Sequence, residues 1–237
     1  VIMFKITAVL TLGLLLCGIA SADDCHPPLK ADWQQYIVGY GSLMEAESKK
    51  MTEPNAGPSR PVQVTGFRRE WNLHGTFPTT FLGVRKDASA RMVAALYRAE
   101  LIEGKIGADA REFSYCRAPV DPASISTLDG SELPAQSQFW SYVNKPEFLS
   151  SPNAKHPIVQ SYVDIFITGC LEMQELVTEQ GFNFVDQCIL TTSGRSKHWV
   201  NDRLYPRRPF MYQKRVLEID EPLKRLLPGY FEAIRIE

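Results

Sequence analysis

The stretch YIVGYGSLME, residues 36–45, decides how this chain is interpreted. Its first part is apolar and β-prone, and two glycines then flank Tyr40. Ser42 and Glu45 follow at the spacing of a capping box, which opens a helix or a helical turn. Glycines let the backbone approach a ligand closely, and free N–H groups at a helix start attract an anion. The stretch therefore predicts a strand that ends in a ligand-binding turn.

The length and net charge of the chain limit the classes of protein to which it can belong. The chain has 237 residues and a formal net charge of -1. This length is sufficient for one substantial hydrophobic core, and there is no basic excess that would attract nucleic acid or an anionic membrane. We therefore expect no nucleic-acid partner.

The N-terminus differs from the rest of the chain. Lys5 precedes an apolar run, residues 6–19, which ends in Ala20-Ser21-Ala22. This pattern is typical of a secretory signal peptide that is cleaved after Ala22. A membrane-spanning helix needs ~20 apolar residues, so an uncleaved anchor is the lesser alternative. We expect residues 1–22 to be a signal peptide and the protein to be periplasmic or secreted, without stable membrane association after cleavage.

Export would place Cys25, Cys116, Cys170 and Cys188 in an oxidising compartment, where disulfides persist. Four cysteines allow three pairings, and the sequence does not choose among them. The cysteines lack C-x-x-C spacing and no histidine pair has metal-ligand spacing, so no metal is expected. The expectation for the cysteines is buried free thiols or one stabilising bridge.

Periodicity predicts an α+β domain over residues 36–237, preceded by a polar leader at 23–35. Strands are expected from residue 36 and at 61–69, 81–84, 92–97, 113–120, 139–143 and 211–219. Helices are expected at 101–111 and 158–176, with a helical turn at 223–227 and a surface loop at 121–134.

Standard nucleotide and hydrolase motifs are missing, which leaves the acidic residues as candidates. Residues 39–41 lack the third glycine of a dinucleotide fingerprint, and Ser42 is not in a G-x-S-x-G elbow. Glu112 stands directly before an aromatic strand. Burial there would raise the pKa of its carboxyl toward that of a general base. From position alone, a surface acid paired with an arginine is the commoner role.

Several segments, taken in order, resemble the γ-glutamyl cyclotransferase-like family. YGSL at 40–43 resembles its substrate loop, and GFRR at 66–69 resembles a strand end with Gly-aromatic-Arg-Arg. VAALY at 93–97 is similar to a family strand. Residues 111–120 resemble the segment of the catalytic glutamate, R-E-x-x-Y-x-R-x-x-V, and 161–163 and 199–203 look like the glutathione-degrading and related bacterial branches.

The resemblance implies a fold, a reaction and a site. The fold is a small mixed β-barrel or sheet flanked by helices. In the reaction, the α-amine of a γ-glutamyl substrate attacks its own γ-carbonyl, which gives 5-oxoproline and a free amine, amino acid or peptide without a cofactor. Glu112 would act as general base and then as acid. The substrate-binding residues would be Tyr40, Gly41, Ser42, Leu43, Tyr115 and Tyr142. For the last two tyrosines, core packing is the alternative.

Some points stay open. The glutathione-degrading branch continues its loop with Ile-Trp, where this chain has Met44-Glu45, so the leaving group is not defined. Alternatives are a secreted module that binds γ-glutamyl groups without turnover, and an amide hydrolase that uses Ser42. Arg203, Arg207 and Arg208 could meet acidic substrate ends, but structural or solvated roles are expected for them.

Overall fold

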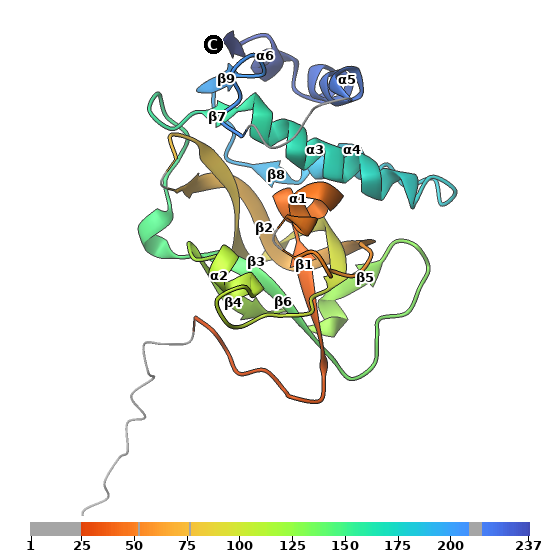
Figure 1. Cartoon of the computed structure of the whole chain (residues 1–237). Coiled ribbons are helices and arrows are strands. Elements are labelled where there is room, and N and C mark those ends of the chain that lie inside the picture. The colour runs from red at the N-terminus through yellow and green to blue at the C-terminus, as the bar shows by residue number, and fades with distance from the viewer. Residues whose placement is uncertain (1–24, 52, 76, 209–214) are drawn as a thin grey trace, which may run out of the picture.

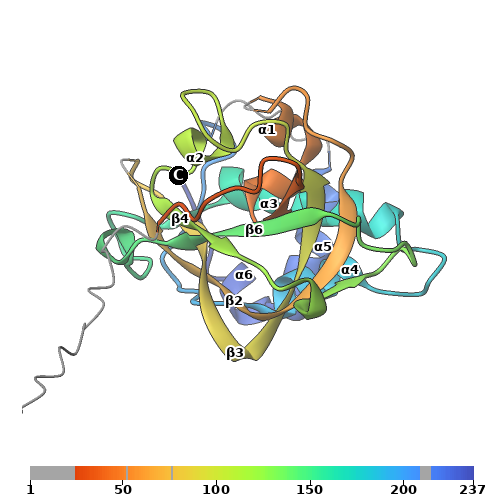
Figure 2. The same ribbon diagram turned by 90° about the horizontal axis from the view of Figure 1, so that it is seen from below.

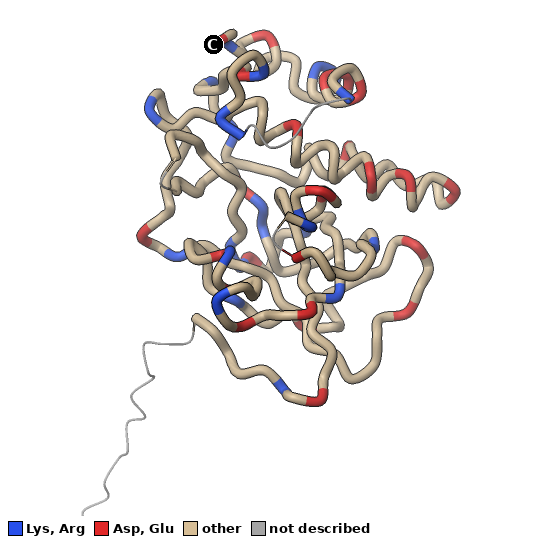
Figure 3. The backbone as a smooth tube through the Cα atoms, in the orientation of Figure 1, with Lys and Arg blue, Asp and Glu red and all other residues tan. Residues whose placement is uncertain are grey.

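The computed structural model describes residues 25–51, 53–75, 77–208 and 215–237. The expected signal peptide, residues 1–22, lies outside the described residues. Within the described ranges, no helix combines the length and apolar character needed to cross a membrane. Basic and acidic residues are interspersed along the part of the chain that Figure 3 shows, as fits a formal net charge of -1.

The core of the fold is a mixed sheet of seven strands. Its order is β4 (Tyr115–Pro119), β6 (Ser137–Asn144), β1 (Gln34–Gly39), β3 (Thr80–Arg98), β2 (Arg60–His74) and β5 (Ile125–Thr127), with β8 (Thr192–Ser193) also paired to β2. The central strand β1 is antiparallel to β3 and parallel to β6. The fold is thus α+β with a mixed sheet, as predicted.

Two long strands curve across this sheet, β2 and β3 (Figure 2). Their register shifts between Thr65 and Phe67, and Gly66 between them has a φ of +85°. Glycine adopts this conformation without the Cβ clash of other residues, so it suits a bulge that bends the strand. The run 92–97 in β3 is buried on both faces, which confirms the prediction from its continuous apolar character.

Helices α3 to α6 and a second, three-stranded sheet cover one side of the main sheet, while α2 lies next to β4 (Figure 1). The helices are α1 (Ala46–Lys50), α2 (Ala108–Arg111), α3 (Gln160–Glu175), α4 (Phe184–Leu190), α5 (Val216–Leu226) and α6 (Pro228–Phe231). The second sheet contains β7 (Ile158–Val159), β9 (Trp199–Asn201) and β10 (Arg235–Ile236). Short 3-10 turns are η1 (Ser42–Met44), η2 (Pro122–Ser124) and η3 (Pro146–Phe148). The largest apolar cluster joins α3 and α4 to β2 and β3.

Several element predictions were wrong. Segments 81–84 and 92–97 belong to one strand, β3. The helix expected at 101–111 is limited to α2, because Leu101 and Ile106 face solvent and supply no buried face for a longer helix. The expected loop at 121–134 contains η2 and β5, which pairs with β2.

The C-terminal part also differs from prediction. The strand expected at 211–219 lies partly outside the described residues, and its remainder starts the helix α5. Ile219 and Leu223 stand four residues apart and are both buried, so they form one face of that helix. The predicted helix at 158–176 begins later, at Gln160, because Ile158 and Val159 pair with β9. The short helix α4 was not predicted, since seven residues give little periodicity.

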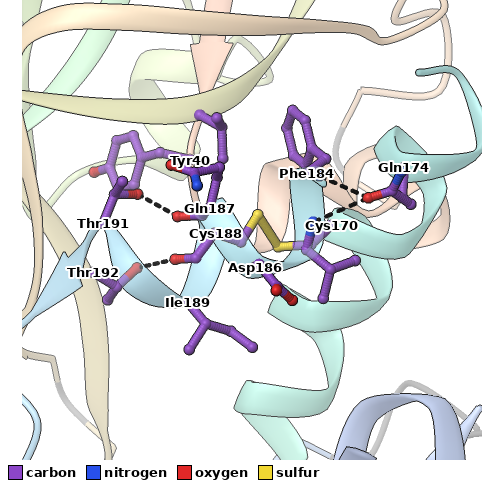
Figure 4. The surroundings of a disulfide bond; sticks show 12 residues. Tyr40, Cys170, Gln174, Phe184, Asp186, Gln187, Cys188, Ile189, Thr191 and Thr192 are labelled. Atoms are coloured by element: carbon purple, nitrogen blue, oxygen red, sulfur yellow. Dashed lines mark hydrogen bonds between the residues drawn. A yellow bond between two sulfur atoms is a disulfide. The ribbon is translucent and has the colours of Figure 1, made fainter. Parts of the chain in front are cut away.

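Two disulfides are present, Cys25–Cys116 and Cys170–Cys188, so the expectation of free thiols or one bridge was wrong. The second bridge joins α3 to α4 (Figure 4). Close by, Gln174 Oε1 accepts from the Phe184 N–H at 2.6 Å and ties the same two helices. The pairing depends on helix packing, which cysteine spacing does not reveal.

We expect the double replacement Cys170→Ala/Cys188→Ala to lower the free energy of unfolding by about 3 kcal/mol. A bridge across 18 residues restricts the unfolded chain by roughly that amount. Urea denaturation without reductant would measure the change. An unchanged midpoint, or two free thiols in the wild-type protein at these positions, would contradict the assigned bridge.

Candidate active site

A cavity of about 300 Å³ lies beside the start of β4. This volume is at the lower end of the range for small-molecule sites. The polar side chains and backbone groups that line it come from Ser42, Ser48, Arg111, Glu112, Ser114, Tyr115, Tyr162 and Arg208. The structure therefore brings together the predicted loop residue Ser42, the predicted base Glu112 and Tyr115.

Glu112 ends helix α2 and turns its carboxylate into this cavity. Its side chain is 14% exposed, and Oε1 lies 2.9 Å from Arg111 Nε. Burial raises the pKa of Glu112, while the charges of Arg111 and Arg208 partly oppose the shift. The carboxylate is thus paired with an arginine, yet it is not a surface acid. A buried carboxyl whose pKa is raised is suited to accept and return a proton during a reaction.

Arg111 connects Glu112 to the loop after β1. Its guanidinium also donates to Ser42 Oγ at 3.4 Å and to the Ser48 carbonyl at 3.3 Å. Ser42 and Glu112 are seventy positions apart in the chain. Tertiary folding therefore brings Ser42 within hydrogen-bond distance of Arg111, the neighbour of Glu112. The arginine fixes the carboxylate relative to the predicted substrate loop.

The loop turns at Gly41 and enters η1 at Ser42. A Cβ at Gly41 would lie 2.9 Å from the Tyr162 hydroxyl oxygen, so the absence of a side chain permits this close approach. The predicted capping box is not formed: Ser42 makes no cap, and Glu45 instead accepts from the Ser48 N–H at 2.5 Å and caps α1. The extended backbone at Glu45 separates η1 from α1 and breaks the continuous turn that a capping box needs.

Two tyrosines line the cavity, Tyr115 and Tyr162, and a third, Tyr40, is buried next to Tyr115. Tyr115 donates its hydroxyl proton to the Leu82 carbonyl at 3.0 Å, and Tyr40 donates to the Tyr142 carbonyl at 2.6 Å. Burial raises the pKa of Tyr40 and Tyr115 well above the ordinary value and that of Tyr162 to about 12. All three are therefore neutral at physiological pH. Tyr40 lies beneath the cavity and supports the lining formed by Tyr115.

Four predicted binding residues are not part of the lining of this cavity: Tyr40, Gly41, Leu43 and Tyr142. The Tyr142 hydroxyl donates to Asp109 Oδ1 at 2.7 Å, and its ring packs in a buried cluster with Ile37 and Trp140. Leu43 belongs to the same cluster. For Tyr142 the structure therefore agrees with the packing alternative, and its backbone carbonyl holds Tyr40.

Sequence reasoning missed other residues of the site. Tyr162 on α3 and Arg208 both line the cavity. Tyr162 stood in a segment with family resemblance but had been interpreted only as a helix residue. A structural or solvated role is expected for Arg208, with contact to acidic substrate ends as the alternative, and its place in the cavity lining agrees with the alternative. For Arg203 the expected structural role holds, because its guanidinium pairs with Asp164 at 2.7 Å and Asp220 at 2.8 Å.

No protein-family model matches the sequence, and no curated protein does either. Solved structures with a similar arrangement include uncharacterized protein loc79017 from Homo sapiens, 14% identical with a TM-score of 0.48 over 63% of this chain and 86% of that one. A gamma-glutamyl cyclotransferase is 15% identical with a TM-score of 0.44, over 62% and 85% of the two chains. The yeast gamma-glutamyl cyclotransferase specific to glutathione is 10% identical with a TM-score of 0.38, over 68% and 96%. At these values none of them assigns an activity to this chain.

Proposed function

We propose that this protein is a γ-glutamyl cyclotransferase, which releases 5-oxoproline from a γ-glutamyl substrate. The observation that carries the proposal is the placement of Glu112. This mostly buried carboxylate faces a cavity of about 300 Å³ and is joined through Arg111 to Ser42 of the predicted substrate loop. The family resemblance of the loop and of the Glu112 segment points to the same pair.

The proposed reaction needs one group that moves protons. The α-amine of the substrate attacks its γ-carbonyl and forms a five-membered lactam. Intramolecular attack already has a high effective concentration, which accounts for up to ~7–11 kcal/mol of the barrier if the geometry is held. Glu112 accepts a proton from the α-ammonium and returns one to the departing amine. A carboxylate whose pKa is raised by burial is suited to both steps.

The surrounding groups would hold the substrate in its folded form. Backbone groups of Tyr40, Gly41, Ser42 and Leu43 are proposed to bind the α-carboxylate and polarise the γ-carbonyl. Tyr115 would line the glutamyl end of the pocket. Arg208, which also lines the cavity, adds positive charge near the carboxylate of the substrate.

We also propose that the protein acts outside the cytosol, after removal of residues 1–22. The two disulfides support this proposal, because such bonds persist in oxidising compartments.

Purified protein lacking residues 1–22 should release 5-oxoproline from at least one member of a panel of γ-glutamyl peptides and amines. Chromatography that separates 5-oxoproline from glutamate gives the measurement. Release of free glutamate that is lost in Ser42→Ala would instead support the amide hydrolase. Binding of a γ-glutamyl peptide without any product would support the binding module.

A further inference from the structure

The mouth of the candidate active site is apolar. Met51, Phe77 and Phe113 line the cavity and are 59%, 53% and 55% exposed. They come from the end of α1, from the connection between β2 and β3, and from the residue after Glu112. Large apolar side chains that gather around one cavity mark a binding surface, whereas scattered ones need no explanation.

The aromatic side chains of this mouth are held by neighbouring rings and charges. Phe113 meets Phe148 edge to face, with ring centroids 6.3 Å apart. The Arg208 guanidinium carbon lies 5.9 Å from the Phe77 ring centroid and 5.3 Å from that of Phe81. Phe81 in turn packs at 4.9 Å against Tyr162. A flat apolar group could bind here at a low entropic cost, since aromatic side chains have few rotatable bonds.

The apolar surface continues beyond the mouth. Met51 also lines a second hollow of about 350 Å³, next to Leu101 and Ile106. Both of these side chains are exposed. The lining of this second hollow also includes Glu53, Asn55 and Glu100, so a substituent longer than one ring could extend along Met51 into a hollow of mixed character.

The proton transfer from Glu112 to the departing amine determines how a substrate would be oriented in the cavity. The departing amine must come within hydrogen-bond reach of Glu112 to receive its proton. The glutamyl group would occupy the polar inner end, lined by Ser42, Tyr115 and Tyr162. The substituent of the amine then points toward Phe113, which directly follows the proposed base.

We infer that the enzyme is selective for γ-glutamyl substrates whose leaving group carries an apolar, above all aromatic, side chain, and that Met51, Phe77 and Phe113 form the subsite for it. This inference rests on the proposed function and defines its substrate class. Glutathione fits less well, because its leaving group offers this apolar subsite only a small thiol side chain.

The test compares kcat/KM for 5-oxoproline release from γ-glutamyl-phenylalanine, γ-glutamyl-leucine, γ-glutamyl-glycine and glutathione. We expect the first two to exceed the last two by about 10- to 100-fold, the range that apolar contacts supply in a pocket. In Phe113→Ala and Phe77→Ala, the ratio of phenylalanine to glycine substrate should fall about tenfold. The control Leu217→Ala, exposed on α5 and remote from the cavity lining, should keep the wild-type ratio.

The two hypotheses fail in different ways. No 5-oxoproline from any compound would overturn the proposed function. Equal kcat/KM across the panel, a preference for glutathione, or rim variants that keep the wild-type ratio would overturn the inference. If there is no turnover, calorimetric binding of γ-glutamyl-phenylalanine and γ-glutamyl-glycine tests the proposed apolar subsite. Tighter binding of the phenylalanine compound supports the subsite, and equal affinities exclude it.

Discussion

Replacing Glu112 by glutamine should lower kcat for 5-oxoproline release by about 10²- to 10⁴-fold, the usual contribution of a positioned general acid–base. Glutamine keeps the size and polarity of the side chain but cannot take up the α-ammonium proton. The loss should appear mainly in kcat, because proton transfer belongs to the chemical step. A variant with wild-type kcat would exclude Glu112 as the base.

Two controls separate catalysis from folding. Glu147→Gln makes the same change at an exposed carboxylate and should keep full activity. Ser42→Ala should retain 5-oxoproline release if Ser42 only helps to hold the substrate and Arg111. Circular dichroism and thermal denaturation should show that Glu112→Gln is folded.

The stability of this variant follows from the direction of the pKa shift. The pKa of Glu112 is raised in the folded protein, so its ionisation destabilises the fold increasingly as pH rises above the pKa of the unfolded chain, and fully above the folded pKa. Glutamine removes this cost, which offsets the loss of the ion pair with Arg111 at 2.9 Å. The midpoint of denaturation at neutral pH should therefore change little.

The same shift predicts the acid limb of the pH–rate profile. The base must be ionised, so kcat/KM should fall as pH decreases through the pKa of Glu112. Because burial raises that pKa, the fall should begin above the range of an ordinary glutamate, ~4.3. The limb should be absent from any residual activity of Glu112→Gln.

Replacing Arg69 by methionine should destabilise the protein by about 3–5 kcal/mol, since hydrogen bonds to charged groups contribute ~1.5–3 kcal/mol each. Arg69 is fully buried, and its guanidinium donates to the carbonyls of Tyr40 at 3.2 Å, Val93 at 2.9 Å and Cys188 at 2.8 Å. Burial lowers its pKa to about 9, so it remains charged at neutral pH. Methionine would fill much of the volume but could donate to none of these oxygens.

The change should also reach the active site. Arg69 joins the start of the substrate loop, at Tyr40, to helix α4 through Cys188 and to Thr192 Oγ1 at 2.7 Å. The acceptor side of this network, with Tyr40, Cys188 and Thr192, is visible in Figure 4. Without the guanidinium, Tyr40 loses the donor that holds its carbonyl, and we expect weaker substrate binding as well as lower stability.

The adjacent arginine is a matched control. Arg68 lies on the other face of β2 and pairs with Asp87 at 2.7 Å near the surface. Surface pairs contribute little to stability, so Arg68→Met should leave the urea midpoint almost unchanged. Equal midpoints for the two variants would contradict the structural role assigned to Arg69.

Local patterns predicted much of the sheet and only part of the helices. The continuous apolar run at 92–97 indicated a strand buried on both faces. A strand alternates apolar and polar residues only when one of its faces is exposed to solvent. The segment 216–219 misled the prediction, since four apolar and acidic residues fit a strand or a helix equally well. Packing of Ile219 and Leu223 into the core decided for the helix.

The candidate site likewise combines residues that local sequence patterns predicted with residues that only the tertiary structure revealed. Ser42 and Glu112 were predicted from their motifs. Tyr162 and Arg208 were not assigned to the site, because they reach the cavity only where α3 and the segment after β9 lie against the sheet. Tyr142 shows the reverse case, in which a residue placed in the pocket by resemblance packs in the core beneath it.

The sequence by itself predicted the strand and turn at 36–45 and the α+β character, because these depend on neighbouring residues, and the family resemblance of its motifs selected Glu112 as the candidate base. Only the tertiary structure decided which cysteines pair, that Arg111 joins Glu112 to Ser42, and that Met51, Phe77 and Phe113 line one mouth. Each of these contacts joins segments far apart in the chain, and their meeting depends on how the helices and strands pack, which short-range patterns do not contain.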